Sequence, residues 1–414
     1  MNLSKMSSFV IYGPAFLHLC SGKILALGKT VMPGEDIIIP KGKSIPIEVL
    51  ENSLIEINLG SNACIKEIPD PVPLCWKEAI EKIIKNDLPI KVMVIGDTDS
   101  GKTTFSVYLA NIAFQYGMRV AVIDLDPGQA EISLPTTIGY GFLNNTIISM
   151  DKIPLNDAIF IGTTTPSDAP MKMIISAKKL VNDALNNNAD IVIINTCGWV
   201  NGVYAREYKC SLIQIISPDF IIAIQKGNEL EHIIRNFENV IRITSSPASR
   251  IRSKEERKEK RENAYSKYFA NSKERIIDLK STKIICSYYT YGNTLSKELL
   301  EKLSKELCLK ILYGETDGKF LFLVTEDEPN IMNKEKICDE LITIKKGSEK
   351  GIIVGLYKNN RKFLGLGIIS EINYEERKMK IITPVSDDIS LIQVGNLKLN
   401  EKYCEIFKYA RAPF

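Results

Sequence analysis

Gly96-Asp97-Thr98-Asp99-Ser100-Gly101-Lys102-Thr103-Thr104 is the stretch of this sequence that decides the fold of its central part. It follows the apolar run 92–95 and precedes a helical pattern at 105–116. A strand, a glycine-rich turn and a helix in this order are the context that the G-x-x-x-x-G-K-[ST] phosphate loop requires. We therefore predict that residues 96–104 bind the phosphates of a nucleoside triphosphate.

The residue types of this loop match the chemistry of phosphate binding. Glycines allow successive backbone N–H groups and the helix N-terminus to face the phosphate oxygens. Lys102 can reach the β- and γ-phosphates, and the hydroxyl group of Thr103 can ligate Mg²⁺. The sequence thus predicts both a nucleotide and a magnesium ion at this loop.

Length and composition indicate a globular protein of several domains. The chain has 414 residues, of which 45% are hydrophobic and 25% are charged, and one compact core does not accommodate this length. The net charge of +3 is too small to argue for nucleic-acid binding by itself. The nine cysteines form no C-x-x-C pair, so neither a zinc site nor a disulfide framework is indicated and a reducing cytoplasm is expected. Apolar runs stay short of the roughly 18 residues that span a bilayer, and we expect no membrane association.

Residue patterns divide the chain into three parts. Residues 1–70 contain short alternating segments separated by glycine or proline, which is typical of a small all-β domain. Residues 71–278 start at a proline-rich linker and then alternate β-type runs with helical patterns, which indicates a mostly parallel sheet with helices on both faces. Residues 279–414 return to strand-like runs. The expected fold class is α/β, with a central P-loop NTPase domain flanked by N-terminal and C-terminal β-rich domains.

The runs behind this division can be given by residue number. In the central part the β-type runs are 91–95, 119–125, 158–161, 190–195 and 219–224, and the helical patterns are 102–116, 170–187, 207–216 and 228–237. In the C-terminal part the strand-like runs are 284–289, 319–324, 351–357, 363–371 and 378–383. The nucleotide is expected at the carboxyl end of the first central strand, where open α/β sheets bind their ligands.

Two carboxylates follow the strand that is predicted after the phosphate-loop helix. The segment reads Val122-Ile123-Asp124-Leu125-Asp126-Pro127-Gly128-Gln129. Phosphoryl-transfer enzymes place such carboxylates around Mg²⁺ and the attacking nucleophile. On a continuing strand Asp124 and Asp126 lie on the same side, and Gln129 can reach the γ-phosphate after the turn. The alternative for Asp124 alone is an acid that merely ends a strand.

Two further segments end predicted strands. They are 160–166, which closes with Thr165-Pro166, and 195–202, which contains Trp199. An aromatic side chain at this edge of the sheet can stack on a nucleobase, an interaction worth roughly 1–3 kcal/mol per base. The alternative is a tryptophan that packs under a loop, and the sequence leaves both readings open.

Residues 250–262 form a charged helical block with seven basic residues and four glutamates. Such a block is usually a solvated helix stabilised by i,i+4 pairs. In a phosphoryl-transfer enzyme, however, an arginine-bearing helix is also the expected lid, whose guanidinium groups neutralise charge on the transferring phosphate. On one helix Arg252 and Arg257 are five positions apart, about 140° around the axis, and would approach the phosphates from different sides.

Together these segments resemble the polynucleotide 5′-hydroxyl kinase family that includes the kinase subunit associated with RNA cleavage and tRNA splicing complexes. The resemblance covers essentially the whole chain. Its most distinctive parts are the Asp-x-Asp-x-Gly-Gln segment at 124–129 and the Asn-Thr-Cys-Gly-Trp segment at 195–199, which generic phosphate-loop proteins lack. The loop at 96–104, the Gly-x-Thr-x-Pro segment at 162–166 and the arginines of 252–257 complete it.

The resemblance implies roles for the residues around the nucleotide. Lys102 and Thr103 would hold the phosphates of ATP and Mg²⁺. Asp126 would be the general base on the 5′-hydroxyl group, with Asp124 and Gln129 assisting around the metal ion and its waters. The implied cofactors are ATP and Mg²⁺.

The resemblance also implies how the other substrate is held. Thr165 and Pro166 would hold the terminal nucleotide of an RNA or DNA with a free 5′-hydroxyl end, and Trp199 would stack on it. Arg252 and Arg257 would be the lid arginines. RNA-processing proteins are the implied protein partners.

One segment departs from the family pattern. In relatives a glutamate, a phenylalanine and a lysine of the N-terminal domain bind adenine. The stretch 21–28 has Leu27 where the aromatic residue falls, and neither the acid nor the lysine is matched. These residues therefore do not fix selectivity for ATP over GTP.

Two other functional classes compete with a kinase. A regulatory GTPase is disfavoured because no Asn-Lys-x-Asp follows the run 219–224, and an assembly ATPase is disfavoured because Asp97 stands where its loop lysine would be. A catalytically silent ATP-binding scaffold of an RNA-processing complex is opposed only by the intact Lys102, Thr103, Asp126 and arginines. We predict an ATP-dependent polynucleotide 5′-hydroxyl kinase, with the silent scaffold as the alternative.

Overall fold

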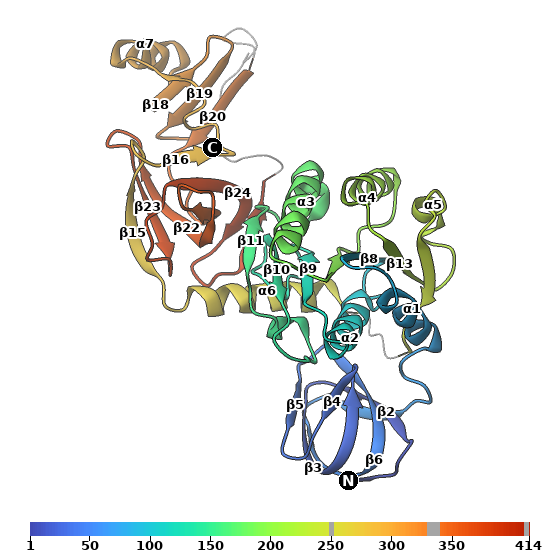
Figure 1. Ribbon diagram of the computed structural model, residues 1–414. Helices are drawn as coiled ribbons and strands as arrows, with labels where there is room; N and C mark the ends of the chain where they lie inside the picture. The colour runs from blue at the N-terminus through green and yellow to red at the C-terminus, as the bar shows by residue number, and fades with distance from the viewer. Residues whose placement is uncertain (248–251, 329–339, 410–413) are drawn as a thin grey trace. The chain divides into compact units, whose positions relative to one another are not determined.

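The computed structural model describes residues 1–247, 252–328, 340–409 and 414. The chain forms two compact units, Met1–Lys260 and Arg261–Phe414 (Figure 1). Within the described residues, no helix has both the length and the apolar character that a membrane span requires.

The first unit begins with a seven-stranded antiparallel sheet. Its central strands follow the order β4-β3-β6-β2-β7, with β1 paired to β6 and β5 paired to β3. The short alternating segments expected in residues 1–70 form strands of this sheet. The strands are β1 (Asn2–Leu3), β2 (Ser8–Tyr12), β3 (Ala15–Ala26), β4 (Lys29–Val31), β5 (Asp36–Ile39), β6 (Ser44–Leu59) and β7 (Cys64–Glu67).

A second seven-stranded sheet forms the centre of the first unit, in the order β11-β10-β9-β12-β8-β13-β14. The strands are β8 (Ile90–Gly96), β9 (Val120–Leu125), β10 (Thr137–Phe142), β11 (Asp157–Phe160), β12 (Ile191–Thr196), β13 (Phe220–Gln225) and β14 (Val240–Thr244). Strands β9, β12, β8, β13 and β14 are parallel neighbours. Strands β10 and β11 are antiparallel, so the run expected at 158–161 belongs to an antiparallel edge.

Helices cover both faces of the central sheet because its strands are apolar on both sides. Residues 92 and 94 of β8 share a core with the N-terminal sheet, α1 (Leu74–Ile84) and α2 (Lys102–Gln115). Residues 93 and 95 of the same strand share a core with α3 (Pro170–Asn186) and α4 (Val203–Ile216). The helical pattern at 228–237 yields only the short α5 (Glu231–Ile234), and the 3₁₀ turns η1 (Met150–Lys152) and η2 (Pro166–Asp168) were not anticipated.

The charged block differs from its expected position. Helix α6 (Lys254–Phe269) starts after Arg252 and continues well past residue 262. Residues 250 and 251 of the block lie outside the described residues. The boundary between the two units falls within α6.

The second unit contains two sheets. The larger follows the order β15-β23-β22-β21-β24-β16 with β25 paired to β24, and the smaller follows β17-β18-β19-β20. Because β15 pairs with β23, residues 273–278 belong to this unit and not to the kinase part that was expected to extend to 278. The elements are β15 (Lys273–Asp278), β16 (Lys283–Ile285), β17 (Asn293–Thr294), α7 (Lys297–Leu307), β18 (Ile311–Thr316), β19 (Phe320–Thr325), β20 (Glu340–Lys345), β21 (Ile352–Tyr357), β22 (Phe363–Asn373), β23 (Lys378–Thr383), β24 (Leu391–Leu399) and β25 (Glu405–Lys408).

Candidate active site

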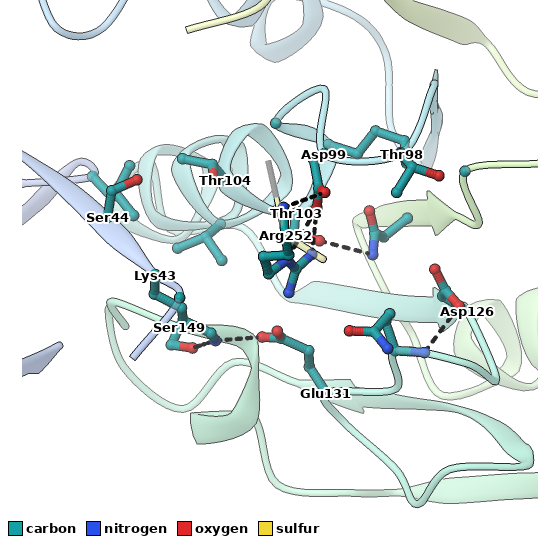
Figure 2. A pocket seen from close by; sticks show the side chains of 18 of the residues that line it. Lys43, Ser44, Thr98, Asp99, Thr103, Thr104, Asp126, Glu131, Ser149 and Arg252 are labelled. Carbon is teal, nitrogen blue, oxygen red and sulfur yellow. Dashed lines mark hydrogen bonds and ion pairs between the residues drawn. The ribbon is translucent and has the colours of Figure 1, made fainter. Parts of the chain in front are cut away.

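A pocket lies at the carboxyl ends of β8, β9 and β12, where the parallel strands bring three loops to one edge of the sheet (Figure 2). It is bounded by the phosphate loop, the turn after β9, the end of β12, a turn of the N-terminal sheet and the segment before α6. Predicted site residues in its lining are Thr98, Asp99, Gly101, Lys102, Thr103, Thr104, Asp126, Gln129 and Arg252.

Two glycines, one in the phosphate loop and one in the turn after β12, determine the shape of this region. Gly101 has φ 99°, a left-handed conformation that glycine adopts without strain, and α2 begins at the next residue. Gly198, in the turn after β12, lies directly on the loop, because a Cβ at this position would be 2.5 Å from Oγ1 of Thr98. The close approach joins the phosphate loop to the turn that carries Trp199.

Lys102 is buried at the base of the pocket. The residue is only 7% exposed, and Nζ donates a hydrogen bond to the carbonyl oxygen of Asp97 at 2.6 Å. Burial, together with the neighbouring ammonium group of Lys209, lowers the pKa of Lys102 to about 8, although Asp126 opposes the shift. A buried ammonium group favours an anion nearby, as the phosphates of a nucleotide provide.

The residues expected to hold Mg²⁺ lie together. Asn195 donates from Nδ2 to Asp124 Oδ1 at 3.2 Å and to Thr103 Oγ1 at 3.5 Å. Burial raises the pKa of Asp124 to about 7, although a hydrogen bond from the N–H of Glu131 opposes the shift. The buried Oδ1 of Asn195 has no hydrogen-bond partner among the described residues. A carboxylate, a hydroxyl group and an amide oxygen are the hard ligands that Mg²⁺ takes, so these residues fit the ion.

The groups expected to hold Mg²⁺ differ from a cluster of His, Cys, Asp or Glu side chains that binds a metal ion without other ligands. Across residues 1–247, 252–328, 340–409 and 414, no three His, Cys, Asp or Glu side chains gather as a metal centre. Mg²⁺ at a phosphoryl-transfer site is typically bound by one or two protein groups together with substrate phosphates and waters.

Asp126 lies in a turn and not on the strand. Strand β9 ends at Leu125, so Asp124 and Asp126 do not share one side of a continuing strand as expected. Asp126 Oδ1 accepts hydrogen bonds from the N–H groups of Gly128 and Gln129, both at 3.0 Å. The turn fixes this carboxylate in the lining of the pocket while leaving it partly exposed, as a base that meets a substrate hydroxyl group requires.

The residues expected to hold the terminal nucleotide lie on neighbouring segments. The described part of the pocket lining does not include Thr165, Pro166 or Trp199. Thr165 precedes the turn η2, which begins at Pro166. This segment approaches the turn after β9, because a Cβ at Gly128 would be 2.4 Å from the carbonyl oxygen of Thr164.

Trp199 combines features of both readings left open by the sequence. Its ring stacks on Tyr208 of α4, with centroids 5.3 Å apart and planes at 23°. It is only partly buried and packs against the core beneath α3 and α4. The stacked arrangement holds the indole ring at the sheet edge, beside the phosphate loop.

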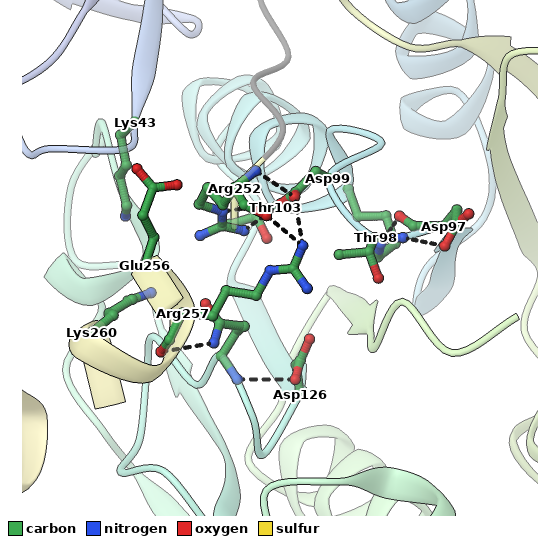
Figure 3. A network of polar contacts seen from close by, with 12 residues as sticks. Lys43, Asp97, Thr98, Asp99, Thr103, Asp126, Arg252, Glu256, Arg257 and Lys260 are labelled. Carbon is green, nitrogen blue, oxygen red and sulfur yellow. Dashed lines mark hydrogen bonds and ion pairs between the residues drawn. The ribbon is translucent and has the colours of Figure 1, made fainter. Parts of the chain in front are cut away.

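The two lid arginines meet at one residue of the phosphate loop. Arg252 and Arg257 both pair with the carboxylate of Asp99 (Figure 3). They therefore converge, in contrast to the expectation of two approaches from different sides of one helix, because Arg252 precedes α6. Gln129 extends the contact, since Nε2 lies 3.5 Å from the carbonyl oxygen of Arg257.

Sequence reasoning missed a buried ion-pair network beside the pocket. Glu131 is 7% exposed at its side chain and pairs with Lys43 at 2.7 Å and with Lys260 at 2.8 Å. Burial opposes the charge of Lys43, yet Glu131 raises the pKa of Lys43 overall. Lys260 of the charged block is thus partly exposed but paired with Glu131. No local sequence signal marks Lys43 as a site residue, because only the fold brings it to the lining of the pocket.

A second lysine behind the phosphate loop was also missed. Lys209 of α4 is fully buried and donates from Nζ to the carbonyl oxygen of Cys197 at 2.8 Å. Burial lowers the pKa of Lys209. Its helical spacing resembles that of any surface lysine, and no sequence signal distinguishes it.

The fold and the pocket define a class of protein. A buried phosphate-loop lysine, a fixed carboxylate and an arginine occupy one cavity, which is the arrangement of a P-loop phosphotransferase.

Comparisons with known proteins identify the family within this class. The family model described as mRNA cleavage and polyadenylation factor CLP1 P-loop matches residues 96–271. A polyribonucleotide 5′-hydroxyl-kinase of Pyrococcus abyssi is 35% identical over 78% of this chain and 91% of its own length. A protein of the same name from Methanocaldococcus jannaschii is 34% identical over the same shares, 78% and 91%. This chain belongs to the polyribonucleotide 5′-hydroxyl-kinase family, which confirms the resemblance seen in its sequence.

A solved structure shares the fold. The structure of wild-type Clp1p in complex with Pcf11p has a TM-score of 0.63, covers 96% of this chain and 97% of its own, and is 14% identical. At this identity the likeness shows the fold alone, and it confirms the α/β P-loop class.

Proposed function

We propose that this chain is an ATP-dependent polyribonucleotide 5′-hydroxyl kinase, which transfers the γ-phosphate of ATP to the 5′-hydroxyl end of RNA. One observation carries the proposal: Lys102, Asp126 and Arg252 line the same pocket, from the phosphate loop, the turn after β9 and the segment before α6. The names of the relatives from Pyrococcus abyssi and Methanocaldococcus jannaschii support it.

In this proposal the loop 96–104 holds the triphosphate. Its N–H groups and the N-terminus of α2 bind phosphate oxygens, and Lys102 neutralises charge between the β- and γ-phosphates. Thr103 and Asp124 are the residues that would hold Mg²⁺, which when bound shields the phosphate oxygens from the nucleophile. Asn195 orients both, through the hydrogen bonds described above.

Asp126 acts as the general base. Its carboxylate accepts the proton of the 5′-hydroxyl group, a bond forms between this oxygen and the γ-phosphorus, and the bond from the γ-phosphorus to the bridging oxygen of ADP breaks. The products are a 5′-phosphorylated RNA and ADP. Arg252 and Arg257 stabilise the charge that spreads over the transferring group.

We assign the remaining predicted residues to the RNA. Thr165 and Pro166 would position the terminal nucleotide, and Trp199 would stack on its base beside the loop. The N-terminal part, residues 1–70, would close the nucleotide side of the pocket, where Leu27 and Lys43 contribute to the lining. Neither residue is an aromatic or acidic partner for adenine.

We infer that the kinase works with RNA-processing proteins in the cytoplasm. The fold relative described as a Clp1p–Pcf11p complex supports a partner of this kind. Residues 279–414, largely a separate compact unit, are the part proposed to dock it.

Transfer of labelled γ-phosphate to short oligonucleotides tests the proposal. We expect label on RNA with a 5′-hydroxyl end and none on the same RNA with a 5′-phosphate end. A DNA oligonucleotide of the same sequence, tested in parallel, measures the preference for the sugar. ATP binding without transfer to any of these oligonucleotides would contradict the proposed kinase activity. It would favour the catalytically silent scaffold instead.

A further inference from the structure

Asp99 is a phosphate-loop residue whose carboxylate contacts the lid segment at several atoms. Its Oδ1 accepts from Nε and Nη2 of Arg252 at 3.0 and 2.9 Å, and its Oδ2 accepts from the backbone N–H of Arg252 at 2.9 Å. Oδ2 also accepts from Nη2 of Arg257 at 3.2 Å (Figure 3). A single carboxylate therefore holds the backbone and both guanidinium groups of the lid.

These contacts are shielded from water. The Asp99 side chain is 2% exposed and each arginine side chain is 25% exposed. Burial raises the pKa of Asp99, but the hydrogen bonds and charge of Arg252, with the charge of Arg257, lower it overall. Charge-assisted hydrogen bonds of this type are stronger and geometrically more selective than exposed ion pairs.

The charge balance suits a phosphate site. One carboxylate between two guanidinium groups leaves one net positive charge beside a pocket that both Asp99 and Arg252 line. Without the carboxylate, two like charges would lie side by side. Asp99 thus allows two arginines to be close together at the phosphate loop.

The contacts also orient the donors. Asp99 occupies the Nε and Nη2 edge of Arg252, so the other N–H groups of this planar fork point away from the carboxylate. Arg257 is held through Nη2 by Asp99 and by the carbonyl oxygen of Arg252 at 2.7 Å. Its buried Nε has no hydrogen-bond partner among the described residues, and such a donor is well suited to a phosphate oxygen.

We propose that Asp99 is a positioning residue of this kinase, which orients Arg252 and Arg257 over the phosphate loop for phosphoryl transfer. The proposal rests on the proposed function for its catalytic consequence. Its structural part, that Asp99 fixes the lid segment to the loop, is independent of the reaction.

Asp99→Asn is the informative change. Asp99 has φ 58°, a conformation that asparagine tolerates, so the loop can keep its shape while the charge is lost. We expect the single-turnover rate of transfer to fall about ten-fold or more, because a charged acceptor shared by two guanidinium groups is lost. The Kd for ATP, measured with a fluorescent analogue, should change by less than about three-fold.

Two further measurements separate orientation from a general loss of structure. Trypsin should cleave the basic segment 252–261 faster in Asp99→Asn than in the unchanged protein. In a background with Arg252→Lys and Arg257→Lys, Asp99→Asn should add little further loss, because lysine does not present the planar fork that Asp99 orients. Glu259→Gln is the matched control, because it removes a carboxylate from the same segment. Glu259 forms only an exposed ion pair with Lys41, at 3.6 Å. This change should leave the transfer rate and the trypsin cleavage unchanged.

An unchanged or faster rate in Asp99→Asn would overturn the proposal, since it would mean that Asp99 competes with phosphate for the arginines. An equal loss in both backgrounds, or unchanged trypsin cleavage, would also overturn it. If the unchanged protein transfers no phosphate at all, the proposed function fails, and the cleavage comparison still decides whether Asp99 holds the lid segment.

Discussion

Lys102 and Asp126 share one pocket, but changing each should cause a different defect. Lys102→Ala should lower kcat/KM by at least about 10³-fold, because stabilisation of several kcal/mol at the transferring phosphate is lost. The melting temperature should stay the same or rise, since Lys102 is buried beside the like charge of Lys209. Transfer assays and thermal unfolding check the two parts. Near-normal turnover would contradict the assigned loop.

Asp126→Asn should lose the rate of chemistry while ATP binding is largely kept. The amide oxygen can still accept from the N–H groups of Gly128 and Gln129, so the turn should persist. A base acts on the nucleophile and contributes little to ground-state binding. Single-turnover rates and the Kd for ATP distinguish the two effects. The comparison variant is Asp124→Asn, which should instead shift the Mg²⁺ dependence, and the reverse pattern would exchange the two roles.

Residue types and spacing predicted the position of the phosphate loop between β8 and α2, because a phosphate loop is a local structure. The chemical roles of its residues and of the two acids stay predictions. Contacts between site residues that are far apart in the sequence were not predictable. Asp99 was expected only to bind nucleotide, yet it contacts residues more than 150 positions away in the chain. Lys43 and Lys209 come to the site from other elements. The local sequence does not show whether the ammonium group of a lysine is buried or exposed.

At the scale of elements, α4 supports the turn after β12, because Tyr208 of α4 stacks on Trp199 of this turn. Trp199→Ala should raise the KM for the oligonucleotide roughly ten-fold or more, using about 1–3 kcal/mol per stacked base. Sequence preference should stay weak, because every base offers a face to stack on. Steady-state kinetics with RNA of different first nucleotides checks both expectations.

The stacking of Trp199 on Tyr208 requires a control for stability. Trp199→Phe keeps an aromatic ring over Tyr208 and should retain most of the affinity for RNA. A lowered melting temperature in Trp199→Ala with an unchanged KM would favour the packing interpretation.

Strands with a continuous or alternating apolar pattern were predictable, including the antiparallel β11, β22 and β23, and strands without such a pattern were not. Strands β8, β9, β12 and β13 match their predicted runs because strands buried on both faces read as continuous apolar segments. Strand β10, with two glycines among its six residues, gave no such signal. In the second unit, α7 was not predicted, although Leu300, Leu303 and Leu307 lie at helical spacing and pack against the smaller sheet. Its sequence therefore does carry the pattern of an amphipathic helix.

On the scale of the whole first unit, the network around Glu131 joins three parts of the chain. Lys43 comes from the N-terminal sheet region, Glu131 from the turn after β9 and Lys260 from α6. Lys43 Nζ also donates to Ser149 Oγ (Figure 2). Burial opposes the charge of Glu131, but its two lysines hold its pKa well below the usual range. Asp151 also pairs with Lys43, at 3.6 Å, but Glu131 is the carboxylate that both lysines share.

Glu131→Gln should lower the free energy of unfolding by less than the about 3–5 kcal/mol of a fully buried pair, because both lysines are partly exposed and Lys43 keeps Asp151 as a partner. The loss should still exceed that of an exposed pair. Lys260→Ala should lower the free energy of unfolding less than Glu131→Gln does, since Lys43 still pairs with Glu131. It should lower it more than the removal of an exposed charge of the same segment. Glu259→Gln is the reference, with an expected change of about 0–1 kcal/mol for an exposed pair. Urea unfolding of the three variants at neutral pH measures these differences. If Glu131→Gln and Glu259→Gln were equally stable, the network would not hold the N-terminal sheet, the turn after β9 and the start of α6 together.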